Sequence, residues 1–192
     1  MAIELKNICK NYGEKEVLKD VNLTLNPNEI TYIMGTSGIG KTTLINIIAG
    51  LVKPDSGQIF GMESKRISFV FQEDRLLEWE TALANVLFVK SSAKAYVNEA
   101  KALLDKAGLA DSINKKAAEL SGGMKRRVCI CRALLADYDL LILDEPFKGL
   151  DEETKPVIMQ LVKDNLREGA YVLCVTHDAT EAEFLGGKRL TI

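Results

Sequence analysis

Hydrophobic and polar positions alternate along the first 25 residues, and short turn sequences interrupt the pattern. Ile3 and Leu5 belong to a first alternating run, and a second run over 17–25 follows the turn residues Asn11 and Gly13. Alternation of this kind with a short connection is typical of antiparallel strands. The pattern therefore predicts two antiparallel strands at the N-terminus.

Short apolar runs and helical spacings alternate through the rest of the chain. Helical spacing appears at Leu44, Ile47, Ile48 and Leu51, and further helices are predicted over about 122–136 and from about 152. Strands are predicted over 30–34, 57–60, 66–71, 140–143 and 171–175, with a short helix and a strand at the end. Strands that alternate with helices indicate an α/β fold with a mainly parallel sheet.

The composition changes between Thr81 and about Ala118, where alanine, lysine and leucine dominate. A helical stripe ends there at Gly108; it consists of Ala100, Leu103, Leu104 and Ala107. We expect a helical subdomain over about 73–120, inserted into one domain that spans residues 1–192. A length of 192 residues fits a single domain.

Charge and composition exclude several classes of protein. Lys and Arg number 25 against 27 Asp and Glu, and this balance argues against a nucleic-acid partner. No apolar run approaches the 18 residues or so that span a bilayer, and the N-terminus lacks a signal-peptide core, so we expect a cytoplasmic protein. The four cysteines show no metal-binding spacing, and we expect reduced, mostly buried thiols.

Residues 35–42 read GTSGIGKT and match the phosphate-loop pattern GxxxxGK[ST]. Glycines let successive backbone N–H groups face a phosphate, and the helix that follows points its positive end at the same anion. Lys41 reaches the β- and γ-phosphates, and Thr42 offers a hydroxyl to Mg²⁺. The predicted nucleotide-binding residues are Gly35, Thr36, Ser37, Gly38, Ile39, Gly40, Lys41, Thr42 and Thr43.

An apolar run over 140–143 ends in two acids, Asp144 and Glu145. Ligands of parallel α/β sheets bind at the carboxyl ends of the strands, so Asp144 is expected beside the phosphate loop, where it can hold Mg²⁺. Glu145 follows at a position suited to polarise a water aimed at the γ-phosphate. Phosphoryl transfer requires little more than a metal, a positive clamp and an oriented nucleophile.

At residues 120–124 the sequence LSGGM resembles the signature LSGGQ of ATP-binding cassette (ABC) ATPases. Other motifs of that family occur along the chain in the family's order. Tyr12 resembles the aromatic A-loop, Gln72 the Q-loop, 149–151 the D-loop and 176–178 the switch-histidine loop. The resemblance covers essentially the whole chain. It implies the P-loop NTPase (RecA-like) fold, with N-terminal antiparallel strands and an inserted helical subdomain.

The resemblance also implies roles for these residues in binding and hydrolysing ATP with Mg²⁺. Glu145, His177 and Gln72 would be catalytic, while Thr42, Gln72 and Asp144 would hold the metal. Tyr12 would stack on adenine. Ser121, Gly122 and Gly123 would contact the γ-phosphate bound by a second copy in a head-to-tail dimer that sandwiches two ATP molecules, and Asp151 would join that nucleotide site.

The segment FQEDRLLEW over 71–79 resembles importer ATPases for nitrate, sulfonate and taurine, although Glu78 replaces a common proline. The resemblance implies an integral membrane permease as partner, with a solute-binding protein in the full system and a location on the inner face of the cell membrane. In that family the segment lies near the groove that receives the permease. Ordinary packing of Trp79 stays equally open.

The sequence departs from the usual family pattern at further positions, and several alternative functions stay open. Met124 and the pair Lys148-Gly149 differ from the usual family residues, and the chain resembles a minimal cassette without a C-terminal regulatory domain. The basic run 125–127 is expected to be a solvated helix face. A non-transport ABC ATPase, an exporter subunit and a regulator that hardly hydrolyses ATP are the alternative functions.

Overall fold

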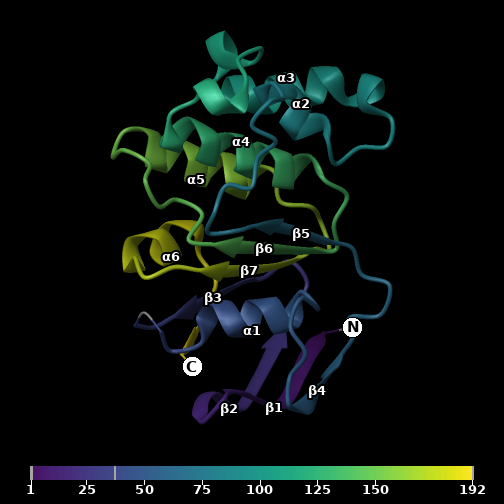
Figure 1. Ribbon diagram of the computed structural model, residues 1–192, viewed down its shortest axis with the longest axis vertical. Helices are drawn as coiled ribbons and strands as arrows, with labels where there is room; N and C mark the ends of the chain where they lie inside the picture. The colour runs from purple at the N-terminus through teal and green to yellow at the C-terminus, as the bar shows by residue number, and fades with distance from the viewer. Residues whose placement is uncertain (1, 37, 192) are drawn as a thin grey trace. The chain divides into compact units, whose positions relative to one another are not determined.

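The computed structural model describes residues 2–36 and 38–191, so the predicted site residue Ser37 lies outside the described residues (Figure 1). The chain divides into two compact units. Met1–Ile67, Tyr138–Asp144 and Arg167–Ile192 form the strand unit, and Ser68–Asp137 with Glu145–Leu166 forms the helical unit. The helical unit is wider than the insertion expected over 73–120.

An antiparallel sheet begins the strand unit. β1 (Ile3–Tyr12) pairs with β2 (Lys15–Leu25) and with β4 (Ser56–Phe60), in the order β2-β1-β4. The register places Ile3 opposite Leu25 and Leu5 opposite Leu23, and all four side chains are buried. Alternation therefore puts the apolar set on one face, as predicted for antiparallel strands.

A parallel sheet forms the centre of the strand unit. Within this unit its strands are β3 (Ile30–Met34), β6 (Leu140–Asp144), β7 (Tyr171–Val175) and β8 (Lys188–Thr191), in the order β6-β7-β3-β8. Every residue of β3, β6 and β7 is buried, which explains their continuous apolar sequences. The predicted mainly parallel sheet is confirmed. β5 (Ile67–Val70) carries the chain into the helical unit.

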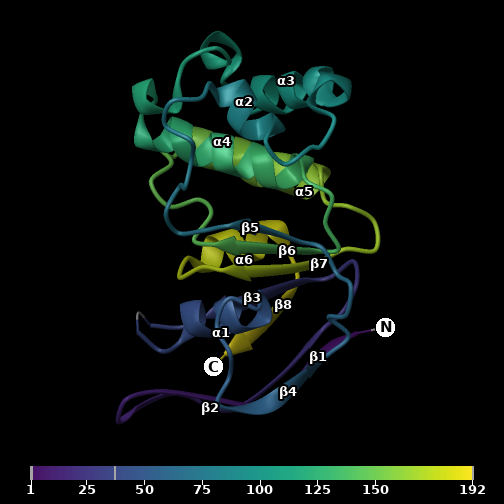
Figure 2. The same cartoon turned by 45° about the vertical axis from the view of Figure 1, so that its right-hand side comes forward.

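Two helices accompany these strands. α1 (Lys41–Ile48) lies between the parallel strands and the antiparallel sheet in both views, and α6 (Ala179–Leu185) follows β7 (Figure 2). The predicted helical stripe ends earlier than expected, because Gly50 adopts a φ of 72° and stops the helix. Leu51 is consequently 59% exposed rather than buried.

The helical unit is built around α4 (Gly122–Leu135), which packs against α2 (Ala82–Leu87), α3 (Val97–Lys106) and α5 (Thr154–Asp164). Short 3₁₀ helices cover Ala93–Tyr96, Ala110–Ser112 and Ala117–Glu119. The predicted helical stripe on α3 is confirmed, since Ala100, Leu103, Leu104 and Ala107 are buried. Because α4 has neighbours on several sides, few of its positions face water.

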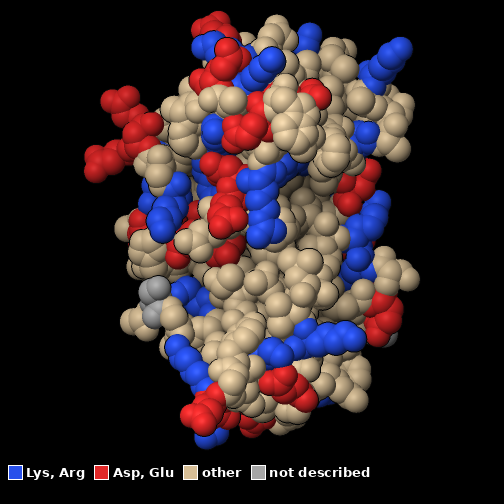
Figure 3. Space-filling view, viewed as in Figure 1, with Lys and Arg blue, Asp and Glu red and all other residues tan. Residues whose placement is uncertain are grey.

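The surface and the thiols agree with the composition. Both signs of charge are interspersed on the face drawn in Figure 3. Among the described residues, no helix combines the length and apolar character needed to cross a membrane. The four cysteines are free, and three of them, Cys129, Cys131 and Cys174, are buried, as predicted.

Candidate nucleotide site

The carboxyl ends of three parallel strands meet at one edge of the sheet. Ile33 of β3 lies opposite Val175 of β7, and Val175 lies opposite Asp144 of β6. The phosphate loop follows β3, the segment with His177 follows β7, and Asp144 ends β6. Two strand spacings separate β6 from β3, on the order of 10 Å, which is the scale of a bound triphosphate with its metal.

The phosphate loop has a backbone that only glycine supports at one position. Gly40 precedes α1 with a φ of 108°, and a Cβ there would stand 2.8 Å from the backbone oxygen of Val17. Gly38 also has a positive φ, 84°, with open space around its Cα. The loop therefore curls tightly against β2 and leaves backbone N–H groups at the start of α1, where an anion is favoured.

Lys41 lies over this loop. Its Nζ donates hydrogen bonds to the backbone oxygens of Gly35, at 2.8 Å, and Thr36, at 3.0 Å. An ammonium group has three N–H donors, so it can keep these bonds while donating to a phosphate oxygen. The structure thus places a positive charge at the mouth of the loop.

The two acids after the apolar run differ in their surroundings. Asp144 is 3% exposed at the end of β6. Glu145 is half-buried, and its backbone has a φ of 47°, in the left-handed region that non-glycine residues rarely adopt. Its backbone oxygen accepts a hydrogen bond from Nη2 of Arg126 at 2.6 Å.

The prediction of a solvated helix face over 125–127 is wrong. Arg126 is 3% exposed. Arg127 donates from Nη1 to the backbone oxygen of Ala107 at 2.7 Å, and Lys125 pairs with Glu78 at 3.0 Å. Consecutive helix positions point about 100° apart, so a helix with neighbours on several sides cannot expose three in a row. No sequence signal separates these cations from an exposed basic run.

The signature residues open α4 in the helical unit. Ser121 caps the helix, because its Oγ accepts a hydrogen bond from the N–H of Met124 at 3.3 Å. A Cβ on Gly122 would meet no atom within 4 Å, and one on Gly123 would lie 3.4 Å from the backbone oxygen of Gly149. The fold of this chain therefore does not itself demand glycine at Gly122.

Asp151, in the predicted D-loop, accepts hydrogen bonds from the backbone N–H and the hydroxyl of Thr154 at 2.7 and 3.0 Å. These bonds, the backbone one foremost, hold the pKa of Asp151 below its ordinary value. The carboxylate is exposed and charged at neutral pH. It stabilises the turn that leads into α5.

The switch segment is fixed by a buried pair that the sequence patterns missed. The Thr176 hydroxyl donates to Glu181 at 2.5 Å, and the N–H of Asp178 donates to the Thr176 hydroxyl at 3.0 Å. Asp178 caps α6 by accepting from Thr180 at 2.9 Å. His177 is exposed between these anchors. An acid at helical spacing after His177 is the signal that could have identified Glu181.

Two further predicted residues, Tyr12 and Gln72, are exposed. Tyr12 ends β1, and its ring centroid lies 5.6 Å from Nζ of Lys10, which pairs with Asp55 at 2.6 Å. Gln72 follows β5 in the helical unit. Both side chains are available to a ligand, although no described contact joins them to the phosphate loop.

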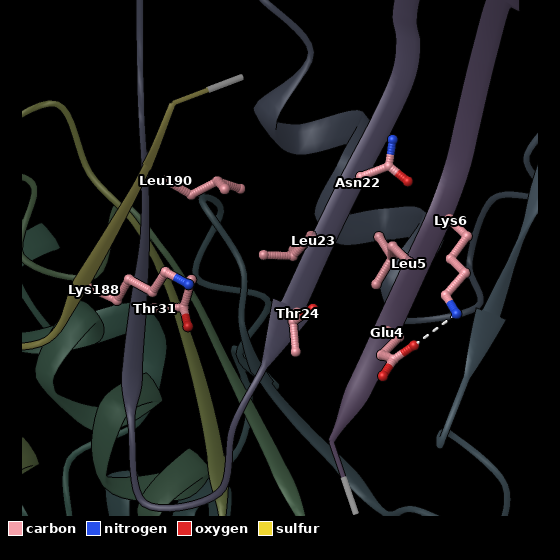
Figure 4. A pocket seen from close by; sticks show the side chains of 9 residues that line it. All are labelled: Glu4, Leu5, Lys6, Asn22, Leu23, Thr24, Thr31, Lys188 and Leu190. Atoms are coloured by element: carbon pink, nitrogen blue, oxygen red, sulfur yellow. Dashed lines mark ion pairs between the residues drawn. The ribbon is translucent and has the colours of Figure 1, made fainter.

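A separate pocket of about 400 Å³ lies in the strand unit, away from the phosphate loop (Figure 4). Thr24, Thr31 and Lys188 are among its lining residues. The Thr31 hydroxyl is buried and has no hydrogen-bond partner within the described part of the chain. None of the predicted nucleotide-binding residues lines this pocket.

Comparison with known proteins gives consistent matches. A family model described as "ABC transporter" matches residues 18–148. An aliphatic sulfonates import ATP-binding protein of Pseudomonas aeruginosa is 38% identical over 192 residues, which cover 95% of this chain and 68% of that protein. A taurine import ATP-binding protein of Pseudomonas entomophila is 39% identical, over 95% of this chain and 76% of that protein.

Two solved structures are similar in fold. The dimeric structure of a bacterial ABC transporter cassette, MJ0796, shares 35% sequence identity and a TM-score of 0.85, over 98% of this chain and 94% of that one. A post-hydrolysis dimer of the same cassette, bound to ADP and phosphate, gives 35% identity and a TM-score of 0.86, over 99% and 94% of the two chains.

Proposed function

The chain belongs to the ABC transporter family, and from that premise we propose that it is the ATP-hydrolysing subunit of an importer for a small solute. The resemblance drawn from the motifs and the expected P-loop NTPase fold are both confirmed. The import function rests on the relatives, which are named as import ATP-binding proteins for aliphatic sulfonates and taurine.

One observation carries the catalytic part of the proposal. The loop that precedes α1 is curled, with Gly40 at a φ of 108° and Lys41 bonded across it, at the edge of the sheet where Asp144 ends β6. An anion cradle and a buried carboxylate at one strand edge are two requirements of a nucleoside triphosphate site.

The oxygen donors assigned to the metal fit Mg²⁺. The hydroxyl of Thr42 and the carboxylate of Asp144 in the strand unit, and the amide oxygen of Gln72 in the helical unit, are hard oxygen ligands, which Mg²⁺ prefers. When bound, the ion would neutralise charge on the β- and γ-phosphate oxygens. Lys41 would add a further positive charge in the ground state and the transition state.

The hydrolytic step requires a water aligned with the γ-phosphorus. We assign Glu145 to orient this water and accept its proton, while His177 contacts the γ-phosphate from the end of β7. The water oxygen forms a bond to phosphorus as the bond to the ADP oxygen breaks. The products are ADP and phosphate.

A second copy completes the site in this proposal. Ser121 and the glycines at the start of α4 form an exposed backbone nest, and open space surrounds Gly122. Glycine that the chain's own packing does not require is suited to close approach by a ligand. We propose that this nest binds the γ-phosphate held by the phosphate loop of the other copy.

Sedimentation of the Glu145→Gln variant tests the dimer. This variant should be dimeric in ATP and monomeric in ADP, because ADP lacks the γ-phosphate that joins the copies. Adding Ser121→Arg should abolish the dimer and spare ATP binding by single copies, since it fills the nest and leaves the phosphate loop unchanged. An equal association state in ATP and ADP would remove the sandwich arrangement.

The helical unit offers a surface for the permease. Trp79 and Phe88 are each 68% exposed, and Val89 adjoins Phe88 in the chain. The buried amide of Asn85 holds the loop that carries Trp79, donating to the backbone oxygens of Leu77 and Thr81 at 3.0 and 3.1 Å. Large exposed apolar side chains on this loop and at the end of α2 are suited to a protein partner.

We propose that this apolar surface places the chain on the cytoplasmic face of the membrane, through a permease that works with a solute-binding protein. Trp79→Ser with Phe88→Ser should prevent co-purification with the permease and leave the ATPase activity of the isolated chain unchanged. Leu51→Ser is the matched control, because Leu51 is 59% exposed in the strand unit. Retained permease in the double variant would place the docking surface elsewhere.

A further inference from the structure

We propose that Arg126 is a positioning residue for Glu145, and that it links Glu145 to the segment that carries Gln72. This inference deepens the proposed function and rests on it. Arg126 lies on α4, five residues after Ser121, in a basic run whose sequence predicts an exposed face. Its burial and its bonds give it a different role.

The guanidinium of Arg126 bonds to two segments of the helical unit. Toward the catalytic segment, Nη2 donates to the backbone oxygen of Glu145 at 2.6 Å, and Nε donates to that of Pro146 at 3.0 Å. Toward the segment after β5, Nη1 donates to the backbone oxygen of Phe71 at 2.5 Å and lies 3.5 Å from Oδ1 of Asp74. Phe71 and Asp74 flank Gln72 on both sides.

This set of acceptors requires an arginine. A planar guanidinium has five donors in fixed directions, so one side chain can serve carbonyls of two segments at once. A lysine has one small ammonium group and would reach fewer of these oxygens. The charge is buried, with the Asp74 carboxylate beside it, so removal of the bonds would leave one buried and two partly buried carbonyls without this donor.

The bond to Glu145 falls at a residue whose backbone conformation is unfavourable for a side chain. Glu145 has a φ of 47°, which persists in a non-glycine residue only when its surroundings fix it. Arg126 holds the carbonyl of this residue and of the next, and the first of these belongs to the peptide group that follows the Cα of Glu145, which carries the side chain. We infer that Arg126 keeps the carboxylate aimed for water activation.

The same guanidinium reaches the residues beside Gln72. A shift of the 71–74 segment would therefore change the bonds of Arg126, and through them the backbone at Glu145. Binding of the metal and the γ-phosphate by Gln72 would in this way change the orientation of the Glu145 carboxylate. The connection consists of hydrogen bonds within one unit and needs no larger rearrangement.

The test compares Arg126→Gln with Arg132→Gln. Arg132 is on the same helix and donates to the backbone oxygens of Arg75 and Asp74 at 3.0 and 3.3 Å, two carbonyls that lie outside the Glu145–Pro146 segment. Arg126→Gln should lower kcat by roughly 100-fold, the scale of a small misplacement of a reacting group, while the Kd for ATP changes less than twofold. Arg132→Gln should leave both within about threefold of wild type.

A double variant separates positioning from general damage. If Arg126 acts through Glu145, Arg126→Gln should cause no further loss of kcat in a Glu145→Gln background. Additive losses would overturn the proposal, as would a wild-type kcat for Arg126→Gln. If the Gln variant does not fold by circular dichroism, Arg126→Lys keeps the charge and should show the same fall in kcat at unchanged Kd. Failure of the wild-type chain to hydrolyse ATP would instead overturn the proposed function.

Discussion

Asp144 and Glu145 are neighbours in the chain, yet they belong to different units and their backbones are held in different ways. Asp144 is the last residue of a buried strand, and its partner in the ladder is Val175 of β7. Glu145 begins the second segment of the helical unit in a left-handed conformation, with its carbonyl bonded to Arg126. The backbone of Asp144, the residue assigned to the metal, is thus held by a sheet. The backbone of Glu145, the residue assigned to hydrolysis, is held by the side chain of Arg126.

The two glycine-rich loops differ in the same sense. In the strand unit, Gly40 is required by the chain itself, because the Val17 oxygen occupies the place of a Cβ. In the helical unit, Gly122 has open space around it. The first loop is shaped by the packing of the chain itself, whereas the second has room that a ligand of another copy can use. Mutations can therefore separate ATP binding by a single copy from the contact that a second copy makes with the same ATP.

Glu145→Gln should have the largest effect, because it removes the proton acceptor and leaves the strand unit unchanged. We expect turnover to fall by about two to four orders of magnitude, the scale of general-base catalysis, with ATP binding retained. Phosphate release under saturating ATP measures it. Hydrolysis at the wild-type rate would contradict the assignment.

Lys41→Ala acts on the strand unit and should affect binding as well as turnover. The ammonium neutralises phosphate charge in both the ground state and the transition state, and such a bond is worth about 1.5–3 kcal/mol. ATP affinity should therefore fall by roughly 10- to 100-fold. Equilibrium titration with a fluorescent nucleotide measures the change, and undiminished affinity would remove Lys41 from the site.

The two glycines provide a matched pair for stability. Gly40→Ala should lower the free energy of unfolding by about 1–3 kcal/mol, since alanine resists a φ of 108°. Gly122→Ala should raise it by up to about 1 kcal/mol, because alanine favours the first turn of an exposed helix. Urea unfolding of both variants gives the comparison. Equal effects would show that the two loops do not differ as described.

The smallest effect concerns the thiols of the two units. Burial raises the pKa of Cys129 and Cys131 to about 12, so at pH 8 only about one in 10⁴ of each is ionised. Cys174 is also buried, and Cys9 is partly exposed. Native protein should take up iodoacetamide at Cys9 alone, and unfolded protein at all four cysteines. Mass spectrometry counts the labels, and native labelling at Cys129 would indicate a looser α4.

The sequence predicted most of the elements, since alternation and helical spacing report which face of a strand or helix is buried. It failed at Leu51, where Gly50 ends α1 before the apolar spacing does. It failed again at Arg126, because charge patterns carry no information about how many neighbours surround a helix. The buried Asn85 and Glu181 were missed as well, although their partners lie nearby in the chain: Asn85 bonds to the loop before its helix, and Glu181 accepts from Thr176.

The sequence by itself determined the family and the identity of the candidate site residues, because phosphate binding requires particular residue types at fixed spacing along one short loop. Only the tertiary structure decided which of these residues the fold holds rigidly and which it leaves open to a ligand. That decision depends on atoms distant in the chain, such as the Val17 oxygen against Gly40 and the Arg126 guanidinium against the carbonyl of Glu145. Such contacts arise from packing, and no spacing within the sequence records them.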